Sequence, residues 1–337
     1  MSDPKVLAST DDYRIVLHQA GEVRSAMTVI TFAGLPNDLA DKGFGTDYCL
    51  KNGWDTIYVS QRRGTEFQGL SREDFLAAVA PETEGREVVC YGSSLGGHAA
   101  FYYGGGLDAR IIAAAPVFPA LTKKWVRNAT DIEILHAPLT RVPRSSKPPF
   151  VIYDPLQALD KRYVDQEIRP AYPDTLRLHE YVLGGHMVLD TLKRTGQLSF
   201  VKRLIEADEM TPLQPLQPGQ FEYHLRNGAL LKGRDLDQAI AEFERAFALQ
   251  PSNRVMVQLL PALIRRADLV RAQQIIDQAQ AACDNDQRIV GRFRDQLVAA
   301  GLDVLPEEEM KERIRSRMFA RRREAVEAAR RAEDQKA

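Results

Sequence analysis

The first 205 residues alternate short apolar, β-branched runs with amphipathic segments, whereas the remainder shows helical periodicity alone. Short apolar runs predict buried strands, and apolar positions three and four residues apart predict helices. We expect strands at 13–18, 26–33, 55–60, 86–91, 110–115, 149–153 and 176–182. We expect helices at 71–79, 95–104, 160–168 and 186–205, the first of them capped by Ser71. This alternation indicates the α/β class, with a doubly wound, mostly parallel sheet.

A proline-rich segment separates this part of the chain from the helical part. Residues 210–219 contain three prolines and a glycine, which is typical of an extended linker. We therefore predict an α/β domain over 1–208, a linker over 209–220, a helical domain over 221–305 and a charged C-terminal helix or tail over 306–337.

The helical domain resembles tetratricopeptide repeats. The residues that carry this resemblance are Ala239, Phe243, Ala246 and Pro251 in a second helix, Tyr223 and Leu230 in a first helix, and Ala272, Ile276 and Ala279 at a period of 33. The pattern is partial, because Asn227 replaces the expected small residue and Pro261 is expected to interrupt the second unit. A generic helical hairpin is the alternative.

Charge and cysteine content narrow the class of protein. The 337 residues have a net charge of -1, which gives no case for a nucleic-acid or membrane partner. Cys49, Cys90 and Cys283 are widely spaced, so neither a disulfide framework nor a zinc site is indicated. No signal peptide or long apolar stretch is evident, and we expect a cytoplasmic protein. The cluster Arg321–Arg323 is interpreted as part of a solvated helix, with an acidic partner or RNA as the alternative.

The strongest chemical signal lies at residues 86–97. An apolar strand pattern runs into Gly92-Ser93-Ser94-Leu95-Gly96 and then into a helical pattern, so the glycines lie on a strand-to-helix turn. With glycine two residues before and after it, Ser94 projects its hydroxyl from the strand end beside a helix N-terminus. A glycine-rich turn without chemistry is the alternative, because G-x-S-x-G alone is common.

This strand, turn and helix resemble the nucleophile elbow of α/β-hydrolases, and the resemblance covers residues 10–205. It implies that Ser94 is a nucleophile and that an acid and then a histidine follow it along the chain. A serine hydroxyl needs a base to remove its proton, and the base needs a group that orients it. Both partners are therefore expected after Ser94.

His186 is the expected general base. It lies just past the last predicted strand, and active sites of open α/β sheets lie outside the carboxyl ends of strands. A histidine that only packs at a helix N-terminus is the alternative. His179 lies inside the strand pattern, and His98 should point along the elbow helix rather than back at the Ser94 hydroxyl.

The acid is less well defined, because Gln157 stands at the position that the resemblance aligns with the family's acid. We expect Asp154, which ends the strand 149–153 before a proline, to orient His186. Asp160 is the second candidate, although it also fits a helix N-cap. A dyad without an acid is the third interpretation.

The resemblance also implies an oxyanion hole of two backbone N–H groups, which we assign to Leu95 and Leu35. Here Phe32-Ala33-Gly34 stands in place of the family's His-Gly pair.

Three further side chains are candidates for substrate binding. Arg62 and Arg63 follow the strand 55–60 and would suit a carboxylate or phosphate, with solvated loop charges as the alternative. Trp125 is the expected apolar wall of a small lid.

Together these patterns predict a serine hydrolase of the esterase or acyl-transfer type. It would act on a small-molecule or acylated substrate and would need no metal or organic cofactor. The helical domain is expected to bind a protein partner or to mediate self-association. Two alternatives stay open: a catalytically silent binding or scaffold protein, which the Gln157 departure favours, and an acyltransferase that acts on a saccharide or polymer.

Overall fold

The computed structural model describes residues 3–119, 132–282 and 284–334. The chain divides into two compact units, Met1–Pro215 and Leu216–Ala337. Each unit has its own apolar core.

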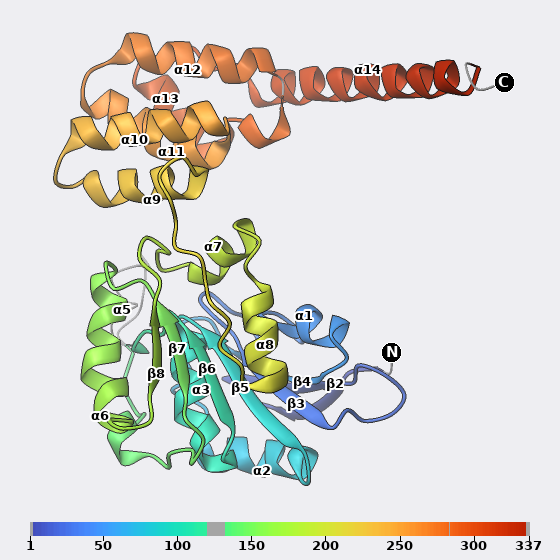
Figure 1. Ribbon diagram of the computed structural model, residues 1–337, viewed down its shortest axis with the longest axis vertical. Coiled ribbons are helices and arrows are strands. Elements are labelled where there is room, and N and C mark those ends of the chain that lie inside the picture. Colours follow the sequence, from blue (N-terminus) through green and yellow to red (C-terminus); the bar gives the residue numbers. More distant parts are fainter. Residues whose placement is uncertain (1–2, 120–131, 283, 335–337) are drawn as a thin grey trace. The chain divides into compact units, whose positions relative to one another are not determined.

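The first unit is built on one sheet of eight described strands in the order β1-β2-β4-β3-β5-β6-β7-β8 (Figure 1). The strands β1 and β2, and β2 and β4, pair antiparallel, and the other neighbours pair parallel. The strand bounds are β1 Lys5–Ser9, β2 Tyr13–His18, β3 Met27–Phe32, β4 Asp55–Gln61, β5 Glu87–Ser93, β6 Arg110–Ala114, β7 Phe150–Tyr153 and β8 Arg177–Glu180. The predicted doubly wound, mostly parallel sheet is confirmed and fits an α/β-hydrolase fold.

Helices cover both faces of this sheet (Figure 1). One face carries α2 (Arg72–Thr83), α3 (Leu95–Gly104), α5 (Ala158–Tyr163) and α6 (Arg169–Ala171). The other carries α1 (Thr46–Lys51), α7 (Val188–Arg194) and α8 (Ser199–Ala207). Short 3-10 segments lie at Gly105–Leu107 and Leu139–Arg141, and a π-helical segment, Val164–Ile168, joins α5 to α6.

Differences from the predicted elements have local causes. The strand β1 was not predicted, because it is a largely exposed edge strand without apolar alternation. The helix expected at 186–205 is two helices, α7 and α8, because Gly196 adopts a φ of +73° between them. The predicted cap of α2 is confirmed: Ser71 Oγ accepts the Asp74 N–H at 3.0 Å.

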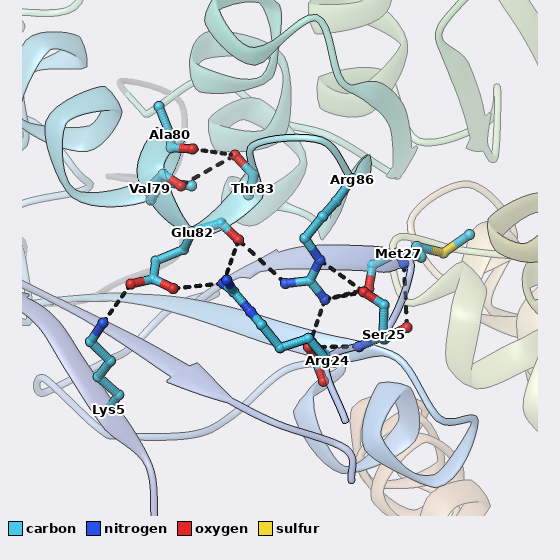
Figure 2. Close-up of polar contacts among 10 residues, drawn as sticks. Lys5, Arg24, Ser25, Met27, Val79, Ala80, Glu82, Thr83 and Arg86 are labelled. Atoms are coloured by element: carbon cyan, nitrogen blue, oxygen red, sulfur yellow. Dashed lines mark hydrogen bonds and ion pairs between the residues drawn. The ribbon is translucent and has the colours of Figure 1, made fainter. Parts of the chain in front are cut away.

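The edge of the sheet at which the parallel strands begin is fixed by a buried carboxylate. Asp55, which is fully buried, accepts the N–H groups of Ala20 and Ser25 and forms an ion pair with Arg86 at 2.6 Å. Figure 2 shows that Arg86 also donates to the carbonyl oxygens of Ser25 and Glu82. These contacts join the segments that lead into β3, β4 and β5. The ends at which these strands begin are therefore held by structural contacts, and a functional site is expected at their opposite, carboxyl ends.

The second unit is helical throughout its described elements. Its helices are α9 Phe221–Leu231, α10 Leu236–Leu249, α11 Asn253–Arg265, α12 Leu269–Ala282, α13 Gly291–Ala299 and α14 Glu307–Asp334, with a 3-10 turn at Asn285–Gln287. The helix α9 packs on α10, α10 packs on α11, and α11 packs on α12. A Cβ at Gly228 would lie 2.6 Å from the Phe243 ring, so glycine permits the close approach of α9 to α10.

Two expectations for this unit are corrected. Pro261 does not interrupt its helix: α11 continues through it, held by buried Leu260 and Leu263 on either side. Tyr223 and Leu230 are only half-buried, whereas Leu225 supplies the buried side chain of α9 to the core. The charged C-terminal segment forms α14, and the side chains of Met310 and Ile314 in its first turns are buried.

Candidate active site

Ser94 lies at the apex of a strained strand-to-helix turn. It follows β5 directly and adopts a φ of 56° and a ψ of -125°, a conformation that residues other than glycine rarely adopt. A Cβ at Gly92 would lie 2.0 Å from the Gly96 carbonyl oxygen, and a Cβ at Gly96 would lie 2.6 Å from the Phe32 carbonyl oxygen. Both glycines are therefore required for the tight turn, which is the geometry of a nucleophile elbow.

A chain of hydrogen bonds begins at Ser94. The Ser94 Oγ lies 2.9 Å from Nε2 of His186, and Nδ1 of the same ring lies 2.9 and 3.0 Å from the two carboxylate oxygens of Asp160. With Nδ1–H donating to the carboxylate, Nε2 accepts the serine O–H. The three groups thus have the mutual contacts of a nucleophile, a base and an orienting acid.

Asp160, and not Asp154, contacts His186, so the expectation that Asp154 orients the imidazole is wrong. Asp154 uses its carboxylate on two backbone groups, the N–H of Leu156 at 3.0 Å and the N–H of Gly185 at 2.8 Å. The N-cap interpretation of Asp160 is also wrong. The helix α5 begins at Ala158, two residues earlier, so Asp160 lies within its first turn.

Burial raises the pKa of the Asp160 carboxyl above its usual range, and the neighbouring Asp154 charge adds to this effect. The hydrogen bond from His186 acts in the opposite direction. The Asp160 side chain is 1% exposed and that of His186 is 13% exposed. Contact with His186 is therefore what favours the carboxylate form in an apolar environment.

A residue pair that the sequence did not suggest joins the two helices of the site. Nδ1 of His98, one turn along α3 from Ser94, lies 2.7 Å from the hydroxyl of Tyr163, which ends α5. Burial, with a smaller contribution from His136, lowers the pKa of His98 to about 3, so its ring is neutral. His98 thus lies along the elbow helix, as expected, and ties α3 to the helix that carries Asp160.

The two expected oxyanion donors lie on adjoining segments. Leu95 is the first residue of α3, so its N–H has no carbonyl acceptor within the helix. The close contact of Gly96 with the Phe32 and Ala33 carbonyl oxygens brings the end of β3, and the loop that holds Leu35, to the elbow. The roles of the Leu95 and Leu35 N–H groups remain predictions.

The expected substrate-binding arginines already have partners. Arg62 donates to Asp12 at 2.7 Å, and Arg63 lies 3.3 Å from Asp38. All four side chains are well exposed. A substrate role for either arginine remains a prediction, and Trp125 lies outside the described residues.

Within 3–119, 132–282 and 284–334, no group of three or more His, Cys, Asp or Glu residues is placed to hold a metal ion. No described helix combines the length and apolar character needed to cross a bilayer. Cys49 and Cys90 are buried free thiols, and burial raises the pKa of Cys49 to about 12. Cys283 lies outside the described residues.

No protein-family profile and no curated protein matches this chain. Solved structures with a similar course include XC6422 from Xanthomonas campestris, an α/β serine hydrolase without a lid (15% identity, 63% of this chain and 98% of that chain, TM-score 0.35). Another is Est1E from Butyrivibrio proteoclasticus (10% identity, 60% of this chain and 99% of that chain, TM-score 0.41). A third is mouse α/β hydrolase domain-containing protein 10 (13% identity, 62% of this chain and 100% of that chain, TM-score 0.41). The strand order of the sheet is what supports an α/β-hydrolase fold for this chain.

Proposed function

We propose that this protein is a serine hydrolase of the esterase or acyl-transfer type. The observation that carries the proposal is the hydrogen-bonded series Ser94, His186 and Asp160, with heavy-atom distances of 2.9 Å at each step. The series starts at Ser94, which has a φ of 56° on a tight turn that glycines at positions 92 and 96 permit. Strain of this kind is typical of functional sites.

In this proposal Ser94 Oγ attacks a carbonyl carbon while His186 Nε2 takes the serine proton. Asp160 holds the ring with Nδ1–H toward it and stabilises the imidazolium that forms. His186 then gives the proton to the leaving group, and the same cycle with water, or with an acceptor alcohol, releases the acyl group from Ser94. The N–H groups of Leu95 and Leu35 are the proposed donors to the oxyanion.

Hydrolysis of p-nitrophenyl esters with short and long acyl chains tests the proposal. We expect turnover by the wild-type protein and its loss in Ser94→Ala and His186→Ala, with each variant still folded by circular dichroism. If no ester in the panel reacts above the Ser94→Ala background, the enzyme assignment is wrong and a silent binding protein is favoured. Added alcohols distinguish a hydrolase from an acyltransferase, because an acyltransferase forms the new ester in preference to the free acid.

We further propose that the second unit is a tetratricopeptide-like binding module for a protein partner and that the protein acts in the cytoplasm. The support is the order in which α9, α10, α11 and α12 pack, each on the next, and the small-residue contact of Gly228 with Phe243. Chromatography of residues 216–337 beside the full chain tests for self-association. Crosslinking in cell extract, with and without this unit, tests for a partner.

A further inference from the structure

Asp154 is a buried carboxylate beside the candidate site, and its hydrogen bonds go to backbone N–H groups and not to the side chains of Ser94 or His186. It follows β7 directly and is 1% exposed. Its Oδ1 accepts the N–H of Leu156 at 3.0 Å, and its Oδ2 accepts the N–H of Gly185 at 2.8 Å. The Asp154 side chain therefore joins its own loop to Gly185, which lies 31 positions further along the chain.

Each of these loops carries one member of the His186–Asp160 pair. Gly185 immediately precedes His186, and its loop holds two residues with positive φ, Leu183 at 63° and Gly185 at 69°. A leucine in this conformation costs roughly 1 kcal/mol or more, so the loop needs outside contacts to keep its shape. Leu156 belongs to the turn that leads from β7 into α5, where Asp160 lies.

We propose that Asp154 is a positioning residue: it fixes the distance between the His186 loop and the Asp160 helix by accepting a backbone N–H from each. The inference rests on the proposed function, since it assigns a task within the same site. It also accounts for a second carboxylate beside Asp160, an arrangement that electrostatics alone would disfavour.

The chemistry of the side chain explains why aspartate is suited to this task. A carboxylate has two oxygens that both accept, whereas the amide of asparagine has one oxygen and one donor group. Asp154→Asn therefore preserves the shape but must leave one of the two N–H groups facing another donor. The bond to Gly185 is buried and the bond to Leu156 is partly buried, so loss of the acceptor is most costly at Gly185, and the loop that precedes His186 is expected to move to recover a hydrogen bond.

Asp55 offers a control for lost stability within the same sheet. It is fully buried, and its two oxygens likewise accept backbone N–H groups from two residues, Ala20 and Ser25. It lies at the opposite edge of the sheet, where the parallel strands begin. Asp55 also pairs with Arg86 at 2.6 Å, so Asp55→Asn removes both a backbone bridge and a buried ion pair, without a direct effect on the site. Its loss of stability is therefore expected to be at least as large as that of Asp154→Asn.

The first measurement does not depend on catalysis. The proton between His186 Nδ1 and Asp160 is expected to give a downfield NMR resonance, which is assigned by its loss in His186→Ala. We expect this resonance to shift or broaden in Asp154→Asn and to keep its position in Asp55→Asn. An unchanged resonance in folded Asp154→Asn would overturn the proposal whether or not the protein is an enzyme.

The second measurement is the rate at which a fluorophosphonate labels Ser94, expressed per folded molecule. We expect Asp154→Asn to lower this rate roughly 10- to 100-fold, because displacement of the base by about 1 Å has effects of that size. Asp55→Asn should leave the rate unchanged. If Asp154→Asn loses stability but labels at the wild-type rate, Asp154 is only structural.

The two proposals can fail separately. Absence of labelling in the wild-type protein would contradict the proposed function, whereas the NMR comparison would still decide the role of Asp154. If Asp154→Asn does not fold, Asp154→Ser takes its place in both measurements. Its single short oxygen can serve at most one loop, so the same shift and the same loss of rate are expected.

Discussion

Replacement of Asp160 by asparagine separates the proposed chemistry of the site from its stability. The side chain is fully buried, and both of its oxygens lie within 3.0 Å of His186 Nδ1. Asparagine keeps the shape but removes the charge, and its NH2 group favours the ring tautomer in which Nδ1 accepts and Nε2 carries the proton. That tautomer cannot take the Ser94 proton. We expect kcat/KM to fall roughly 10³- to 10⁴-fold, or about 4 to 5.5 kcal/mol of transition-state stabilisation.

The same substitution is expected to stabilise the fold at neutral pH. Burial raises the pKa of Asp160, so its contribution to stability is present at pH values below its unfolded pKa and is lost as the pH rises through the folded value. At pH 7 the wild-type protein bears the cost of a buried charge, and Asp160→Asn removes it.

Ester hydrolysis and urea unfolding on one preparation test both effects. A loss of activity together with a higher midpoint of unfolding fits the account. Activity within tenfold of wild type in Asp160→Asn, with Ser94→Ala inactive, would refute the role of Asp160 and favour a dyad without an acid.

Three further substitutions or conditions have expected outcomes. Gly92→Ala places a Cβ 2.0 Å from a backbone carbonyl, so we expect it to abolish serine labelling; a normal labelling rate would refute the turn geometry. Burial lowers the pKa of His98 to about 3 and that of His136 to about 4. The contribution of these neutral rings to the free energy of unfolding is therefore complete above pH 6.5 and is lost as the pH falls toward the lowered pKa values. At pH 5 each ring should lower the free energy of unfolding, measured with urea, by about 2 kcal/mol relative to neutral pH. His98→Gln should make the free energy of unfolding less dependent on pH. Gly228→Leu places side-chain atoms against Phe243 and should destabilise the second unit by about 1–3 kcal/mol, as monitored by its helical signal, without altering the labelling of Ser94.

The sequence predicted the elements whose pattern is set locally. The strand β2 begins and ends where the apolar alternation places it, and α3 spans the residues expected after the Ser94 turn. The turn itself was predictable because its glycines are adjacent in sequence to the serine whose conformation they permit. His186 was predictable because the ends of parallel strands meet at one edge.

The carboxylate that contacts His186 was not predictable, because it is determined by contacts between distant segments. Asp154 is closer to the strand end and has the simpler sequence argument, yet its oxygens accept the N–H groups of Leu156 and Gly185. The start of α5 at Ala158, rather than at Asp160, then turns Asp160 toward His186. A shift of two residues in a helix boundary therefore reverses the assignment, and such boundaries are the least certain part of a sequence prediction.

The link between His98 and Tyr163 was hidden for the same reason. Each residue lies in an unremarkable apolar helical pattern, and only the packing of α3 beside α5 brings Nδ1 to the hydroxyl. The ion pairs of Arg62 with Asp12 and of Arg63 with Asp38 were likewise not predictable, because the partners are far apart in sequence.

The most direct test of the account is stoichiometric labelling of the folded wild-type protein by a fluorophosphonate, with the modified residue located by mass spectrometry. The account predicts one label per chain on Ser94, its absence in Ser94→Ala, and strong slowing in His186→Ala and Asp160→Asn. A folded wild-type protein that takes up no label, or takes it up on another residue, would contradict the proposal that Ser94, His186 and Asp160 form a working nucleophile.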